Sequence, residues 1–182
     1  MVTMDSDEHP RPATTIEQLA KLKPTFDQEG VVTAGSASGI CDGAGTVILA
    51  SEDSLGDAQP LCRLVSYAVV GCDPSIMGIG PVPAIQQALH KAGKTIADVD
   101  RFEINEAFAA QFLACSKELD LDMDKTNIHG GAISIGHPLG ASGSRITAHL
   151  ANEFAQDPSV NLSVGAACIG GGQGIAVVLE RV

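Results

Sequence analysis

Apolar residues along the 182-residue chain follow helical spacing in some stretches and extended patterns in others. Near the N-terminus, overlapping capping boxes over residues 14–18 accompany Ile16 and Leu19, and Pro24 follows them. Such a start signal followed by a proline predicts a short helix. The polar residues 1–13 that precede it are expected to be exposed.

The rest of the chain alternates between predicted strands and predicted helices. Apolar runs rich in β-branched residues predict strands over 46–51, 61–70, 100–105, 161–168 and 174–182. Helices are predicted over 84–93, with Pro83 at the first position and Gly93 closing it, and over 106–120, with Phe108, Phe112, Cys115 and Leu119 on one face. This alternation predicts an α/β fold whose last two strands are adjacent.

A further helix is predicted to follow His137, and its composition is unusual. One stripe carries larger residues and a second carries only small ones: Leu139, Gly143, Ile146, Leu150 and Phe154 form the first, and Gly140, Ser144, Ala148 and Ala151 the second. A helix that is apolar or small on both sides is typical of a position between two layers. This chain is expected to cover only one of these faces.

Composition narrows the possible functions. Charged residues are 18% of the chain, below the roughly 25% of an average soluble domain, and the formal net charge is -11. An acidic chain repels phosphate backbones, so no nucleic-acid partner is expected, and no apolar run approaches the ~20 residues of a membrane span. Five cysteines without a C-x-x-C pair indicate a reducing compartment and no zinc knuckle, and no metal site is predicted.

His137 is the sharpest candidate for chemistry, within the stretch GHPLGASG. If Pro138 occupies the first helical position, the imidazole lies at the positive end of a helix dipole, which favours a neutral base. The alternative is a histidine that merely caps a helix. His129 and His149 are interpreted as surface or packing residues, although His129 is close enough in sequence to line the turn before His137.

Two more candidates follow predicted strands. Cys168 precedes three glycines, whose backbone N–H groups could approach a ligand and form an oxyanion hole beside a proton-transferring thiol. The alternative is a plain glycine turn after a core cysteine. Asn105, in NEAF, could orient a water molecule, or it could simply cap the next helix.

These motifs occur together and in the order NEAF, GHPLGASG and CIGGGQG. Together with the stretches DEHPRPATTIEQL and GCDPSIMGIGPVPAI, they make the chain resemble the thiolase family, in particular its mitochondrial 3-ketoacyl-CoA type. The resemblance implies a thiolase-like α/β fold, with one βαβαβαββ half, a mixed sheet and a buried Gly/Ala-rich helix. Residues 1–35 would form a leading segment and residues 36–182 the C-terminal domain. It also implies acyl transfer to CoA in fatty acid β-oxidation, in the mitochondrial matrix.

The resemblance also implies a role for each matching residue. His137 would take the proton from a nucleophilic cysteine and donate into an oxyanion hole that a water held by Asn105 completes. Cys168 would move a proton on or off the acetyl Cα, and the backbone N–H of Gly170 would serve a second oxyanion hole. Ser38 and Met77 match positions that line the pantetheine tunnel, and Phe108 is assigned to the same CoA site.

The chain departs from the family in length and at single positions. Thiolases are about twice as long, and the half that carries the nucleophilic cysteine has no counterpart here. Ser36 and His129 stand where the family usually or often has Asn. The expected partners are therefore an N-terminal thiolase half or a second copy of this chain, with CoA and acyl-CoA as substrates and no covalently bound cofactor.

Two other functions compete with a catalytic half. The chain could be a non-catalytic module that binds CoA or a thiolase partner. It could also be a decarboxylating condensing enzyme of the same superfamily, but those enzymes usually employ a histidine where this chain has the cysteine of CIGGG.

Overall fold

A mixed four-stranded sheet lies at the centre of the structure, a computed structural model that describes residues 3–182. Its strands are β1 (Arg63–Gly71), β2 (Arg101–Ile104), β3 (Leu162–Ile169) and β4 (Gln173–Glu180), in the order β1-β4-β3-β2. β2 and β3 run parallel, and the other two pairs are antiparallel. The predicted pair of adjacent strands around a glycine turn is confirmed.

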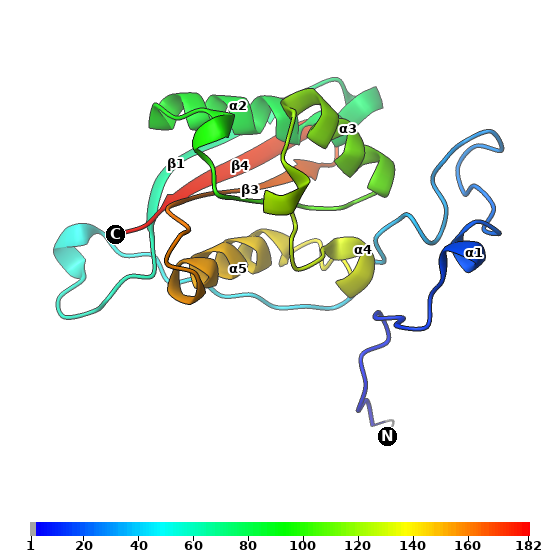
Figure 1. The fold of residues 1–182 in the computed structure, drawn as a ribbon, viewed down its shortest axis with the longest axis horizontal. Helices are drawn as coiled ribbons and strands as arrows, with labels where there is room; N and C mark the ends of the chain where they lie inside the picture. The colour runs from blue at the N-terminus through cyan, green and yellow to red at the C-terminus, as the bar shows by residue number, and fades with distance from the viewer. Residues whose placement is uncertain (1–2) are drawn as a thin grey trace.

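Helices cover both faces of this sheet (Figure 1). On one face lie α2 (Pro81–Ala92) and α3 (Ala109–Leu119), and on the other lie α4 (Ala132–Ile135) and α5 (Ser142–Gln156). The βαβαβαββ order that the resemblance implies contains a strand between α3 and α5, but only a single parallel bridge between Phe102 and Thr126 forms there. The α/β class and the mixed sheet are confirmed.

Local signals set most helix ends. The helix α1 (Ile16–Leu19) begins with the predicted capping box of Thr15 and Gln18, and Gly93 ends α2 with a φ of 66°. Helix α2 starts earlier than predicted, at Pro81, because the first turn needs no N–H from proline. Short 3₁₀ turns occupy Glu52–Ser54, Pro74–Ile79, Ile96–Asp98 and Met123–Lys125.

Two predictions about helix starts are wrong. Phe108 is not part of a helical face, because it is the extended residue that precedes α3. Pro138 is not the first residue of α5, which begins at Ser142 after a turn. This turn leaves Leu139 outside the helix and 64% exposed.

Helix α5 packs on the sheet through only one of its two sides. Ile146, Leu150 and Phe154 are buried, and Gly165 of β3 gives room for the first two, because a Cβ there would press on both side chains. The other side of α5, including Gly143, faces an extended segment or solvent. In the predicted stripe of larger residues, Leu139 lies outside the helix and Gly143 is exposed. The small-residue stripe is partly buried, at Ser144, Ala148 and Ala151.

The strand predicted over residues 46–51 does not form. Residues 41–50 run irregularly beneath α5 (Figure 1), with Gly43 against Pro138 and Gly45 against Ser144. Ile48 is 92% and Leu49 is 72% exposed. A strand needs a neighbouring strand to satisfy its backbone groups, and among the described residues no strand pairs with residues 46–51.

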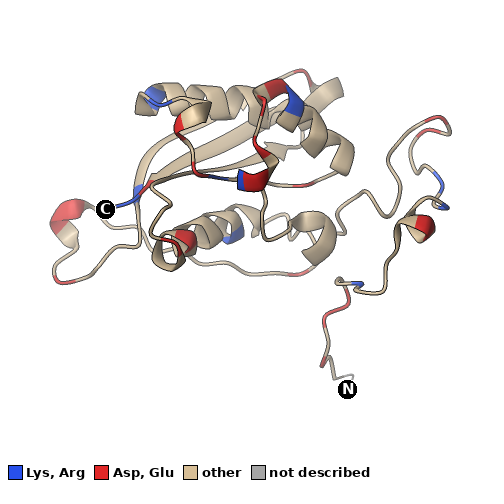
Figure 2. Ribbon diagram, in the orientation of Figure 1, with Lys and Arg blue, Asp and Glu red and all other residues tan. Residues whose placement is uncertain are grey.

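Charges avoid the central part of this segment. Acidic side chains gather in the N-terminal residues and in the loop around residues 52–57 (Figure 2), whereas residues 43–51 carry no charge. Within residues 3–182, no helix is long and apolar enough to cross a membrane.

The close contact between Gly80 and Gly174 generates a stability prediction. Because a Cβ on Gly174 would collide with the backbone of Gly80, we expect Gly174→Ala to lower the free energy of unfolding by about 1–3 kcal/mol or more. Gly143→Ala is the matched control, since it adds a methyl group to α5 in open space and should be neutral or stabilising by up to about 1 kcal/mol. Urea unfolding of both variants checks this, and equal stabilities would contradict the packing.

Candidate active site

The parallel pairing of β2 and β3 brings Asn105 and Cys168 to one edge of the sheet. Ile104 is in register with Ala166, and the Asn105 N–H donates to the Ala166 carbonyl at 2.9 Å. Asn105 is completely buried directly after β2, and Cys168 is partly buried near the end of β3. The carboxyl ends of neighbouring parallel strands are where α/β sheets commonly form sites.

His137 reaches the same edge from the turn between α4 and α5. Its backbone N–H donates to the Gly39 carbonyl at 2.8 Å, which ties it to the segment that leads to residues 41–50. Its ring lies between two polar side chains. Nδ1 is 2.7 Å from Ser142 Oγ, and Nε2 is 3.3 Å from Asn105 Nδ2.

These contacts select one tautomer of the imidazole. The Ser142 hydroxyl donates its single proton to the Pro138 carbonyl at 3.2 Å, so it accepts a hydrogen bond from Nδ1–H of His137. Nε2 then carries the lone pair and accepts from the Asn105 amide. The ring is therefore held as a neutral base whose basic nitrogen lies at the edge of the sheet.

The other atom of the Asn105 amide is equally informative. Oδ1 is buried and has no hydrogen-bond partner among the described residues. A buried acceptor without a partner costs about 1–3 kcal/mol, and bound water commonly satisfies such groups. The geometry thus fits an amide that holds a water molecule, as the resemblance implies.

Burial also keeps His137 neutral. Desolvation lowers the pKa of its imidazole below the usual value, and the positive charge of Arg145 lowers the pKa further. The predicted cause was different, namely a helix beginning at Pro138. That cause is wrong because α5 begins at Ser142, although Ser142 still brings the first turn of the helix to the ring.

Cys168 is held as a thiol. Burial raises the pKa of its side chain, and nearby Cys72 raises the pKa further. No hydrogen bond joins Cys168 to His137 in residues 3–182. Gly170 follows β3 in a turn where a Cβ would meet nothing within 4 Å, which leaves its backbone open to a ligand.

The residues assigned to the CoA site fall into two places. Ser38 donates from both its N–H and its hydroxyl to the Ala107 carbonyl, each at 3.0 Å, and Ala37 bridges to Phe108. Met77 lies in a separate turn, Pro74–Ile79, which packs against α3. An open cavity of about 340 Å³ between residues 41–45 and 138–144 lies next to His137, but none of the candidate catalytic residues lines it.

Sequence analysis missed Ser142 and Arg145, which respectively orient the imidazole of His137 and lower its pKa. A serine that follows a histidine closely in the sequence is a weak signal for a hydrogen bond between them. Ser142 reaches His137 only because the chain turns at Leu139 and Gly140. Arg145 acts through space from the next turn of the helix, so no spacing rule would single it out.

Comparison with known proteins matches both the sequence and the fold. The family model described as thiolase, C-terminal domain, matches residues 58–181, and the model described as thiolase, N-terminal domain, matches residues 1–53. The mitochondrial 3-ketoacyl-CoA thiolase of Pongo abelii is 62% identical over 180 residues, covering 98% of this chain and 45% of that protein. The acetyl-CoA acetyltransferase of Escherichia coli K12 is 52% identical over 178 residues, covering 96% of this chain and 45% of its own length.

A solved structure agrees closely. The crystal structure of human mitochondrial 3-ketoacyl-CoA thiolase in complex with CoA superimposes with a TM-score of 0.94 at 60% identity, covering 98% of this chain and 46% of that one. The chain therefore spans just under half the length of these relatives. On the strength of its sequence and its fold, the chain belongs to the thiolase family.

Proposed function

We propose that this chain is the C-terminal half-site of a thiolase, which transfers acyl groups to CoA with a nucleophilic cysteine from another polypeptide segment. The observation that carries this proposal is the imidazole of His137, held neutral with Nε2 as the basic atom beside Asn105. A base in this state can receive a proton from a thiol. Its relatives carry the names of enzymes of this class.

In the proposed reaction, each residue handles one proton or one developing charge. His137 Nε2 takes the proton of the nucleophilic thiol, and the thiolate attacks the keto carbon of a 3-ketoacyl-CoA. The water on Asn105 Oδ1 and the His137 Nε2–H donate to the resulting oxyanion. The oxyanion then re-forms a carbonyl and the bond between Cα and the keto carbon breaks, which leaves an acyl-enzyme and the enolate of acetyl-CoA. Cys168 Sγ–H protonates the Cα of this enolate to give acetyl-CoA, while the N–H of Gly170 stabilises the enolate oxygen.

The second half of the reaction returns the proton. The Cys168 thiolate takes the proton of incoming CoA, whose sulfur attacks the acyl-enzyme and releases a shortened acyl-CoA. The nucleophilic cysteine leaves as a thiolate and recovers its proton from His137 Nε2–H. The raised pKa of Cys168 suits this alternation, because a thiol that resists ionisation is both a proton donor and, once ionised, a strong base. The same steps in reverse constitute a Claisen condensation.

The nucleophile is expected outside this chain. Burial raises the pKa of Cys115 to about 11 and also raises the pKa of Cys62, so neither thiol readily becomes a thiolate. The uncharged, apolar stretch over residues 43–51 and the uncovered side of α5 offer a surface for the missing half. We infer that an N-terminal thiolase half covers it, or a second copy of this chain where that half is lacking.

The same proposal includes the domain limits, the substrates and the cellular location of the chain. Residues 36–182 would act as the C-terminal domain and residues 1–35 would lead into it, because Ser36 is the first described residue whose backbone bonds to the region of α3, at the Ala109 N–H. The family models instead place the change from N-terminal to C-terminal domain between residues 53 and 58. CoA and acyl-CoA are the proposed substrates, with Ser38, Met77 and Phe108 near the pantetheine arm and no covalently bound cofactor. The mitochondrial matrix is the proposed location, because the relatives from Pongo abelii and Homo sapiens are named as mitochondrial 3-ketoacyl-CoA thiolases.

Complementation tests the catalytic proposal. We expect no thiolysis of acetoacetyl-CoA by the purified chain, and activity when a separately expressed thiolase N-terminal half is added, because only the mixture contains both nucleophile and base. In the mixture, His137→Asn and Cys168→Ser should each lower the rate by about 10²–10⁴-fold. His90→Asn, on the exposed side of α2, is the matched control and should not change it.

Two outcomes would contradict this proposal. Thiolysis by the purified chain alone would locate the nucleophile in this chain, provided that a cysteine-free variant prepared in the same way shows no activity. A folded chain that binds the N-terminal half or CoA but yields no activity would instead support a non-catalytic binding module.

The hydrogen bond from His137 to Ser142 predicts a spectroscopic signature. In the unmodified chain, ¹⁵N NMR should show His137 protonated at Nδ1, with an apparent pKa below about 6.5. The imidazole therefore stays neutral as the pH falls through that value and gains its charge only at lower pH. Ser142→Ala should produce a mixture of tautomers while the pKa stays low, whereas Ser144→Ala is the matched control; an Nε2–H imidazole in the unmodified chain would contradict the assignment.

A further inference from the structure

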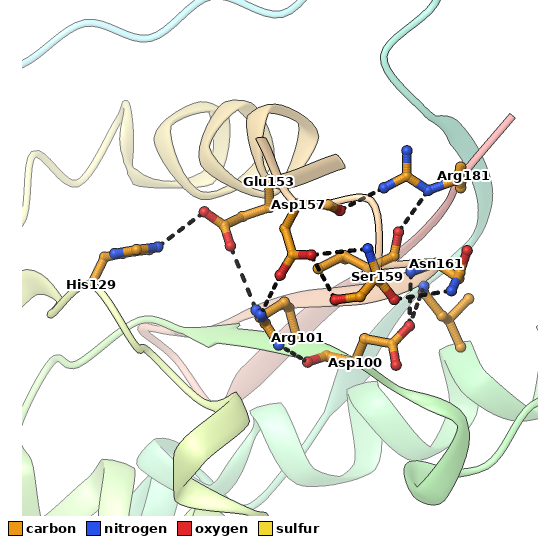
Figure 3. Close-up of polar contacts among 10 residues, drawn as sticks. Asp100, Arg101, His129, Glu153, Asp157, Ser159, Asn161 and Arg181 are labelled. Carbon is orange, nitrogen blue, oxygen red and sulfur yellow. Dashed lines mark hydrogen bonds and ion pairs between the residues drawn. The ribbon is translucent and has the colours of Figure 1, made fainter. Parts of the chain in front are cut away.

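A second group of ionisable side chains, outside the proposed active site, gathers at the outer edge of β2. His129, His149 and Glu153 each offer one ligand atom, and these atoms all lie within 4.8 Å of one another. His129 Nε2 is 3.1 Å from Glu153 Oε1, and Figure 3 shows the ring pointing at that carboxylate. The two imidazole rings meet edge to face with centroids 5.4 Å apart.

Helix α5 supplies two of the three groups. His149 and Glu153 are one turn apart, so both side chains lie on the same face of the helix. The same four-residue separation places two metal ligands side by side on the helix of other metalloproteins. The third group, His129, comes from the loop that follows the bridge at Thr126.

This loop is held firmly before any ion binds. Asn127 acts as a substitute strand partner for the edge of β2, because its Oδ1 accepts from the Ile104 N–H at 2.8 Å and its Nδ2 donates to the Ile104 carbonyl at 2.9 Å. Its own N–H donates to the Phe102 carbonyl at 2.9 Å. Since His129 is two residues further on, its position is largely fixed by these bonds.

Neighbouring groups orient the two ligands on the helix. Arg101 Nε lies 3.5 Å from Glu153 Oε2, and Arg101 also pairs with Asp157, which leaves Oε1 directed at His129 (Figure 3). Glu103 Oε2 lies 3.8 Å from His149 Nε2, and Arg145 binds the other oxygen of Glu103 at 3.0 Å. These ion-pair contacts place charged side chains around Glu153 and His149, as outer groups commonly surround the ligands of metal sites.

We propose that His129, His149 and Glu153 bind a divalent transition-metal ion of the zinc class. Two imidazole nitrogens and one carboxylate oxygen suit Zn²⁺ or Co²⁺ better than Ca²⁺ or Mg²⁺, which prefer oxygen alone. Three protein ligands leave a coordination position for water. The half-exposed ring of His129 gives the ion a path from solvent, while Glu153 is 7% exposed.

A bound ion would fasten the 127–130 loop to α5, and α4 and His137 follow that loop directly along the chain. The site would therefore stabilise the segment that carries the proposed base without taking part in acyl transfer.

Metal titration of the full chain tests the site. We expect calorimetry with ZnCl₂ to give one equivalent of bound Zn²⁺ and a rise in Tm, and Co²⁺ to give visible bands of a nitrogen and oxygen site without sulfur-to-cobalt absorption. His129→Asn should weaken binding at least about tenfold, since even loss of an outer contact costs 10–100-fold. His149→Gln should act likewise, and His90→Asn is the matched control.

Other outcomes would overturn the site. Failure to bind Zn²⁺, equal affinity of His129→Asn and the unmodified chain, or a strong sulfur-to-cobalt band would each contradict it, the last by locating the ion on cysteines. Because the readouts are affinity, Tm and absorption, they do not depend on thiolase activity. Circular dichroism of the metal-free variants separates loss of a ligand from loss of the fold.

Discussion

The parallel pairing of β2 with β3 is the constraint on which the remaining structure depends. It sets Asn105 next to Ala166, and so brings the ends of both strands to one edge of the sheet. With only four residues, β2 makes few ladder bonds of its own, and the side chain of Asn127 completes its outer edge. The proposed active site and the proposed metal site both lie around this short strand.

Helix α5 connects the two regions through successive turns. Ser142 in its first turn fixes the tautomer of His137, Arg145 lowers the pKa of that ring and pairs with Glu103, and His149 and Glu153 lie further along. Arg145 thus acts on His137 through space and on Glu103 through an ion pair. A shift of this helix relative to the sheet would displace residues of both sites. Its position is set by buried side chains that pack tightly on β3 at Gly165.

The uncovered side of α5 explains the unusual composition of the chain. A helix made of small and apolar residues on two sides is stable between layers, and here one layer is a sheet while the other is an irregular segment with Ile48 and Leu49 in solvent. The low charged fraction agrees with the proposal that another thiolase half covers this side of the helix. The chain belongs to the thiolase family and spans just under half the length of these relatives, which supports the same proposal.

The sequence by itself determined the features that depend on neighbouring residues. The capping box at Thr15, the αL glycine at Gly93, the paired strands around the glycine turn and the identity of His137, Asn105 and Cys168 as candidates all rest on local patterns. Local backbone and side-chain chemistry is enough to specify such features. The motifs also identified the family, because their order along the chain is specific.

Only the tertiary structure decided what depends on distant partners. Residues 46–51 have the composition of a strand but stay irregular, because strand formation needs a neighbour that the described residues do not provide. Ser142 could be recognised as the partner of His137, and His129 as the partner of Glu153, only when turns and packing had set their separations. A sequence lists the groups available for hydrogen bonds and metal binding, but the distances that make them partners come from the folded chain.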